Sequence, residues 1–252
     1  MKGNRTITAA IAAIVVLAFS MFAHADVTYV NYNLSVPTGD LGTSQHTYGT
    51  TPYELPISGF ATNDNPTINF NTMTGNWNVT NATPSNLYGK ITQNDPGETG
   101  LGMTADPDGD HEMWDQPNAP YQWGFVMVDV SNILNNVNLL YFHMRIGSAQ
   151  DHEWYTIWGS TAQDPNNATL LMVGQGGNDA QSPWFDVPNF RDYKYIWVGA
   201  VIDPNSHVDH SDITLESEIA FDQNPIPEPG TLAMMGTGVL GLAGILRRKM
   251  KA

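Results

Sequence analysis

An acidic run of seven residues carries the side chains best suited to chemistry: Asp106-Pro107-Asp108-Gly109-Asp110-His111-Glu112. Its aspartates alternate, and the glycine allows a sharp turn that would aim their carboxylates at one hard cation. Calcium takes about six to eight oxygen ligands from carboxylates and backbone carbonyl groups. The sequence therefore indicates either a structural calcium site or a solvated acidic turn. The candidate calcium ligands are Asp106, Asp108, Asp110 and Glu112.

The same run also offers a catalytic interpretation, through the spacing Asp110-x-Glu112-x-x-Asp115. In an extended strand Asp110 and Glu112 would share a face, and glycoside hydrolysis uses a pair of carboxyl groups. The spacing resembles that of jelly-roll glycosidases of the laminarinase type, whose motif is Glu-x-Asp-x-x-Glu, with Asp and Glu exchanged here. Because the sequence shows no second catalytic element, we expect a protein that is not an enzyme, with a secreted polysaccharide hydrolase as an alternative.

Two other polar clusters are weaker candidates. Asp151-His152-Glu153 offers a second pair of carboxylates. The segment from His207 to Asp212 offers two imidazoles with carboxylates, which suit a transition metal. A zinc site needs a third ligand fixed in space, and the sequence assigns none. The alternative for the segment from His207 to Asp212 is a solvated loop.

Aromatic side chains in loop-like sequence suggest a sugar-binding platform. Sugars stack on exposed rings, while nearby amides and carboxylates bind their hydroxyl groups. The candidates for this platform are Trp114, Tyr121 and Trp184. Packing beneath long loops is the alternative for all three. Trp154, Trp158 and Trp197 lie in expected strands and are assigned to the core.

The elements that must position these residues are expected to be β-strands. Apart from the two ends of the chain, no segment has an apolar period typical of a helix. About ten short strands bounded by Gly, Pro, Asp and Asn indicate an all-β fold, an antiparallel β-sandwich or jelly roll in one domain. The segment 37–66 is expected to be a long irregular excursion. The expected strands are 27–36, 67–71, 76–80, 86–92, 122–130, 139–146, 153–159, 169–173, 193–202 and 213–221.

Two of the expected strands are apolar on both faces, Trp123–Val128 and Tyr195–Val198. A strand of this kind lies in the middle of a sheet whose two faces are both covered. We therefore expect a second sheet or a loop over the outer side of these strands.

The composition limits the partners of the central region. Residues 26–224 hold 24 acidic side chains against four basic ones, Lys90, Arg145, Arg191 and Lys194. A surface with this balance repels nucleic acid and anionic lipid and attracts divalent cations. The chain has no cysteine, which excludes disulfide bonds and a thiol nucleophile.

The N-terminus has the order of a secretory signal peptide. Lys2 and Arg5 precede an apolar run that ends near Phe22, and Ala23-His24-Ala25 follows. This order predicts cleavage after Ala25. The first domain boundary is therefore expected between residues 25 and 26, and an uncleaved anchor is the alternative.

The C-terminus, residues 225–252, has three parts. A Pro227-Glu228-Pro229 motif is followed by an uncharged apolar run from Thr231 to Leu246. As a helix this run would rise about 24 Å, somewhat short of the roughly 30 Å hydrocarbon core of a bilayer, and it is expected to be a short tail anchor. A basic end follows and would stay in the cytoplasm. Its cations include Arg247, Arg248 and Lys249.

These three parts together resemble the PEP-CTERM sorting signal of Gram-negative bacteria. The resemblance covers only the C-terminal tail. It implies recognition by exosortase, a membrane enzyme that is thought to cut near the motif and release or re-anchor its substrate. It also implies a transient inner-membrane intermediate and a final place at the cell surface or outside the cell. Members of the family occur in bacteria that produce exopolysaccharide. We therefore expect a non-catalytic surface or matrix protein of a biofilm, with a carbohydrate-binding adhesin as another alternative.

Overall fold

Antiparallel pairing joins all the strand pairs that the structure describes, as expected for an all-β chain of this kind. The computed structural model describes residues 29–223, apart from 93–97, 118–121, 137–138, 151, 164–167, 178–180, 204–209 and 217. Tyr29–Gln223 forms one compact unit. The expected signal peptide and membrane-spanning tail lie outside the described residues. Within the described part, no helix has the length and apolar character needed to cross a membrane.

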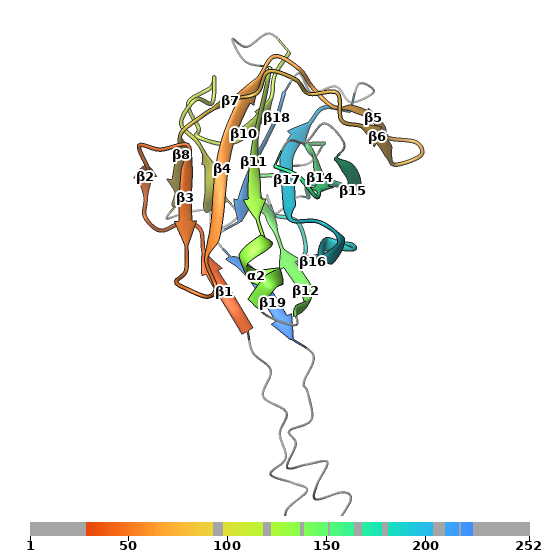
Figure 1. Cartoon of the computed structure of the whole chain (residues 1–252). Helices are drawn as coiled ribbons and strands as arrows, with labels where there is room; N and C mark the ends of the chain where they lie inside the picture. The colour runs from red at the N-terminus through yellow and green to blue at the C-terminus, as the bar shows by residue number, and fades with distance from the viewer. Residues whose placement is uncertain are drawn as a thin grey trace, which may run out of the picture. The chain divides into compact units, whose positions relative to one another are not determined.

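The first of two layers is a sheet centred on β11 (Trp123–Asp129). On one side β11 pairs with β4 (Leu55–Thr62), and on the other with β17 (Tyr195–Val201). Figure 1 shows these three strands side by side in the middle of the domain. The outer strands of this layer are β3 (Gln45–Tyr48), β7 (Thr83–Pro84), β14 (Trp154–Ser160) and β15 (Thr169–Gln175).

The second layer is made of two sheets, and two segments of the chain pass from one sheet into the other. β18 (Ser211–Glu216) continues into β19 (Glu218–Gln223), and β12 (Leu139–Met144) continues into β13 (Ile146–Gly147). β12 pairs with β19 and β13 with β18, so the two segments run alongside each other. The other strands are β1 (Tyr29–Asn33), β2 (Gly39–Asp40), β8 (Leu87–Lys90), β9 (Gly100–Met103) and β16 (Phe185–Asp186).

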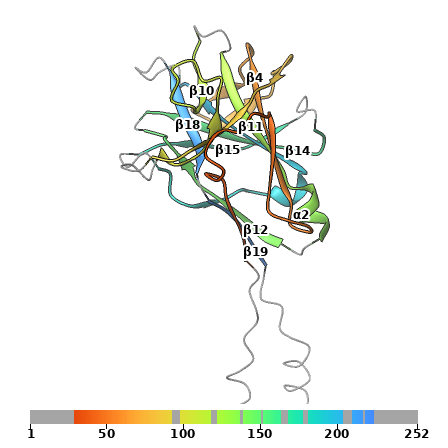
Figure 2. The same ribbon diagram turned by 90° about the vertical axis from the view of Figure 1, so that its left-hand side faces the viewer.

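The layers are joined by β10 (Met113–Asp115), which pairs with β11 on one side and β18 on the other. Two short helices complete the described fold, α2 (Ser131–Asn136) and the 3-10 helix η3 (Phe190–Asp192). Figure 2 shows the domain from the side, with α2 near β12 and β19. The sequence did not predict α2, because six residues are too few to show a helical period.

The main core lies between the layers. From the first layer it takes alternate side chains such as Val126 and Val128 of β11 and Ile196 and Val198 of β17, all fully buried. Leu215, Phe221 and other side chains of the second layer face them. This alternation confirms the sandwich-like all-β arrangement expected from the sequence.

A second, aromatic core lies on the opposite face of the first layer. Trp123 and Phe125 of β11 lie there with Trp158 and Trp197, and Trp77 packs onto all four. The covering segment begins with the hairpin of β5 (Thr67–Asn69) and β6 (Thr74–Asn76). The expectation that a loop would cover the outer side of these strands is confirmed.

Three expectations about strands were wrong. The segment 37–66 is not an irregular excursion, because it contains the hairpin of β3 and β4. Residues 77–80 are irregular and not a strand, although Trp77 and Val79 are buried. The long strand expected at 213–221 is divided into β18 and β19, which pair with different neighbours.

Candidate functional site

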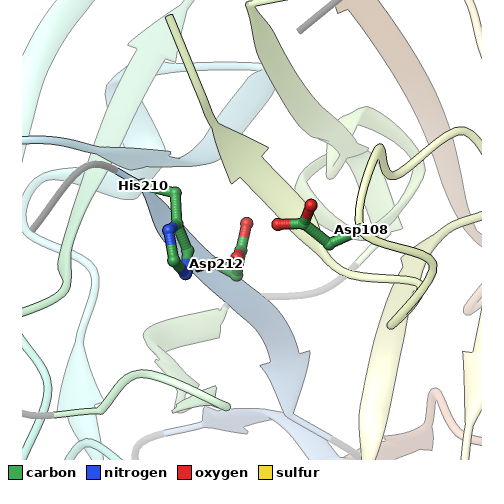
Figure 3. Close-up of side chains that lie close together, drawn as sticks. All are labelled: Asp108, His210 and Asp212. Atoms are coloured by element: carbon green, nitrogen blue, oxygen red, sulfur yellow. Dashed lines mark ion pairs between the residues drawn. The ribbon is translucent and has the colours of Figure 1, made fainter. Parts of the chain in front are cut away.

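Three connections between strands meet beside the start of β18. The β9–β10 connection carries Asp108, and the β13–β14 connection carries Glu153. His210 is the last residue of the β17–β18 connection, and Asp212 is the second residue of β18. Ligand atoms of Asp108, His210 and Asp212 all lie within 4.8 Å of one another. Figure 3 shows Asp212 between the other two, with the carboxylate of Asp108 directed toward it. We call Asp108, His210 and Asp212 the triad.

The loop that carries Asp108 is shaped by its own aspartate and glycine. The carboxylate of Asp106 accepts the backbone N–H groups of Asp108 and Glu112, at 3.2 and 3.1 Å. Gly109 has φ +86°, a left-handed conformation that favours glycine. The loop returns so close to β9 that a Cβ on Gly102 would lie 1.8 Å from the carbonyl oxygen of His111. Asp108 is thereby held at the tip of a tight turn.

Strand pairing brings Asp212 to this loop. Its register partner on β10 is Trp114, so it lies opposite the strand that follows the acidic loop. On its other side, the backbone N–H of Asp212 donates to Oε1 of Glu153 at 3.3 Å. His210 Nε2 lies 3.7 Å from Oδ2 of Asp212. Oδ1 of Asp212 is buried and has no hydrogen-bond partner.

Asp212 is surrounded by carboxyl groups that repel one another. Burial, and after it the neighbouring carboxylates of Asp106, Glu112, Glu153 and Asp108, together raise the pKa of Asp212 to about 9. Burial is also the main cause of the raised pKa values of Asp106 and Glu153. Several acids held together in this way favour protonation or a bound cation.

Lys90 is a basic side chain beside this group of carboxylates. Lys90 forms an ion pair with Glu112 and lies 3.8 Å from Glu98. Burial raises the pKa of Glu112 to about 7, against the opposing effects of Lys90 and Ser148. The Glu112 carboxylate is therefore engaged by Lys90.

The structure separates the four predicted calcium ligands. Only Asp108 belongs to the triad. Asp106 is occupied by backbone N–H groups, Glu112 pairs with Lys90, and Asp110 is exposed. The two remaining triad members come from a cluster that the sequence singled out for a transition metal but left without a third ligand. Asp108 lies where a third ligand would be needed.

The pair of carboxylates expected for catalysis is also not formed. Asp110 is exposed and Glu112 is buried, and His111 between them has φ +64°. The two carboxylates therefore do not share the face of an extended strand. Asp115 is buried and accepts hydrogen bonds from Asn65 and from the backbone of Ile202, at 2.6 and 2.8 Å, so it ties β10 to the segments that follow β4 and β17.

The predicted sugar platform is wrong for Trp114, which lies in β10 and is fully buried. A ring without exposed faces cannot stack on a sugar. Tyr121 lies outside the described residues. Trp184 is 44% exposed, and the Arg145 guanidinium lies 6.0 Å from its ring centre.

Comparison with known proteins identifies only the tail. The chain has no match among curated proteins or among solved structures. Residues 225–249 match the PEP-CTERM protein-sorting motif. This stretch contains Pro227, Glu228 and Pro229 and extends through Arg247, Arg248 and Lys249. The C-terminal tail of this chain is therefore a PEP-CTERM protein-sorting motif, following an all-β domain.

Proposed function

We propose that the chain is an exported surface or extracellular-matrix protein that exosortase processes, with a non-catalytic β-domain. The observation that carries this proposal is the sorting motif at residues 225–249, which begins two residues after β19 ends at Gln223. A signal peptide at residues 1–25 would start export. The apolar run and basic end of the tail would hold the precursor in the inner membrane for exosortase. Association with exopolysaccharide is part of the same proposal. It rests on the occurrence of this sorting family in bacteria that produce exopolysaccharide.

Processing predicts a mature chain that lacks both ends. Intact-mass analysis of the protein recovered from the surface or medium of its host should give a mass that starts at Asp26 and ends near Pro227–Pro229. Replacing Glu228 with alanine should leave the uncut tail on the chain, whereas Glu218→Ala, on the exposed side of β19, should leave processing unchanged. A surface form that still carries Thr231–Lys251 would contradict the proposal.

We further propose that the triad binds a divalent cation that stabilises the fold. Two carboxylates and an imidazole converge there, the buried Oδ1 of Asp212 lacks a partner, and the surrounding acids repel one another. The imidazole favours a borderline ion such as zinc over calcium, which prefers oxygen ligands alone. The ion would hold the β9–β10 loop against β18.

Metal binding should appear as a shift in thermal unfolding. In chelator the midpoint should be lowest, and zinc should raise stability by about 2.7 kcal/mol at a hundredfold excess over its Kd. Asp108→Asn should abolish the increase, and Asp110→Asn, in the same loop but outside the triad, should keep it. Stabilisation by calcium alone, unaffected by His210→Ala, would instead favour an all-oxygen site. Equal midpoints in chelator, zinc, calcium and magnesium would contradict any metal site.

A further inference from the structure

The outer face of the sheet β1–β19–β12–β16 carries two exposed aromatic rings. Tyr141 is 45% exposed and Trp184 is 44% exposed. Among the described residues, the other large hydrophobic side chains with comparable exposure are the aliphatic Val36, Met73 and Ile91. The exposed aromatic rings of the described domain thus gather on one sheet, and this is not the loop surface expected from the sequence.

Strand alternation places both rings on the same face. In β12, Phe142 and Met144 are fully buried in the main core, so Tyr141 and His143 point the other way. His143 pairs with Asp186 across the strands, and Trp184 lies two residues before Asp186. Arg145, against which Trp184 packs, is four residues from Tyr141, or about 13 Å along an extended strand.

Polar contacts hold the side chains between the rings. The His143 ring stacks beside Tyr141, with ring centres 5.8 Å apart and planes at 17°. His143 Nδ1 lies 2.5 Å from Oδ1 of Asp186, and Nε2 lies 2.8 Å from Oδ2 of Asp222. The imidazole thus links β12 to both of its neighbouring strands.

The second ring is held in a similar way. The Arg145 guanidinium lies 6.0 Å from the Trp184 ring centre, and its Nε donates to the carbonyl oxygen of Ser182 at 2.9 Å. The guanidinium also donates to Gln181, whose amide in turn donates to Glu216 at 3.3 Å. Side chains fixed before binding lose little conformational entropy when a ligand arrives.

This face is mainly acidic, which limits the partner. The carboxylates of Asp186, Glu218 and Asp222 share it with the guanidinium of Arg145. The Arg145 guanidinium donates to polar neighbours, and the His143 imidazole lies between the carboxylates of Asp186 and Asp222. The face therefore keeps the negative charge that the whole domain carries, so an anionic ligand would be repelled. Two rings separated by polar groups also lack the continuous apolar area of a stable protein interface.

An uncharged ligand rich in hydroxyl groups fits the aromatic rings and the exposed carboxylate of this face. The electron-rich face of an aromatic ring attracts the C–H groups of a sugar ring. The carboxylate of Asp186, whose side chain is 54% exposed, can accept hydrogen bonds from hydroxyl groups between the rings. Two stacking positions with polar groups between them suit a chain of sugars better than a single one.

We propose that this face binds an uncharged polysaccharide, with Tyr141 and Trp184 as stacking platforms and Asp186 as a hydroxyl acceptor. The site is separate from the triad and does not depend on the proposed processing. It would make the β-domain a glycan-binding module.

Affinity electrophoresis of the exported protein tests this proposal. The gels would contain dextran, laminarin, glucomannan or xyloglucan, with the acidic polysaccharide alginate as a charged comparison. At least one uncharged polysaccharide should retard the protein. Tyr141→Ala and Trp184→Ala should each weaken binding about tenfold or more. Tyr141→Phe should keep it, because the ring remains.

Met73→Ala is the matched control, because Met73 is 50% exposed and lies in the β5–β6 hairpin, which covers the first layer. Its binding should equal that of the parent, and unfolding midpoints should confirm that all variants are folded. Retardation by alginate alone, or by none of the polysaccharides, would overturn the proposal. So would an equal loss with Met73→Ala. Dimerisation that Trp184→Ala abolishes, without polysaccharide binding, would show that the face binds a second copy instead.

Discussion

Replacing Trp77 with alanine is expected to lower the free energy of unfolding by about 3–5 kcal/mol. Trp77 lies within 5.4–5.7 Å, ring centre to ring centre, of Trp123, Phe125, Trp158 and Trp197. It is 8% exposed and covers a sheet face that would otherwise present these rings to water. Chemical denaturation, followed by circular dichroism, measures the loss.

Trp184→Ala is the matched control for this prediction, because it removes the same side chain from an exposed position. It should change stability by about 1 kcal/mol or less. If Trp77→Ala cost no more than Trp184→Ala, the aromatic core would not contribute to stability as described. Binding of a hydrophobic dye should also rise in Trp77→Ala alone.

Raising the pH from about 5 to about 8 in chelator is expected to destabilise the domain. Asp212 has an ordinary pKa of 3.8 and a folded pKa of about 9, raised by burial and by neighbouring carboxylates. Between these values the folded state holds a proton that the unfolded state has lost, so stability falls as pH rises. One proton over three pH units corresponds to at most about 4 kcal/mol. Denaturation curves at each pH measure the slope.

Asp212→Asn should flatten this dependence and make the metal-free domain more stable at about pH 8. Part of the slope should remain, because burial also raises the pKa of Glu112 to about 7 and of Asp115 to about 6. Asp192→Asn, which removes a charge from an exposed position in η3, is the control and should leave the slope intact. An identical slope in Asp212→Asn and the parent would show that Asp212 is not the group responsible.

The sequence predicted the strands whose apolar runs are long. β11 and β17 were found within about two residues at either end, because nearly every side chain in them is buried. β4 was missed because its core-facing positions include Gly59 and Ala61, which give little apolar signal. It also contains Pro56, which lacks an N–H. The structure accommodates this proline because the pairing of β4 with β11 begins one residue later, at Ile57.

The candidate site was predicted in pieces. Alternating aspartates identified the loop of Asp108, and a mixture of His and Asp identified the loop of His210 and Asp212. These residues are about a hundred positions apart, and only the pairing of β10 with β18 brings them together. A single sequence does not reveal which connections meet at a sheet edge. The face of Tyr141 was missed for a related reason, because exposure of a strand residue depends on which side of the sheet is covered.

The adjacency of β1 and β19 has a mechanical consequence. Tyr29 lies opposite Asp222, so the chain enters and leaves the domain at neighbouring points. Tension between the two termini would peel these strands apart, opening their hydrogen bonds in succession. If the chain is instead held at Gln223 while a bound ligand pulls on the outer face of β12, the force acts along β19 and slides it against β12. Ladder hydrogen bonds lie perpendicular to antiparallel strands, so this load would be shared by all of them at once. The domain is thus built to resist shear between its outer face and its C-terminus more strongly than separation of its ends.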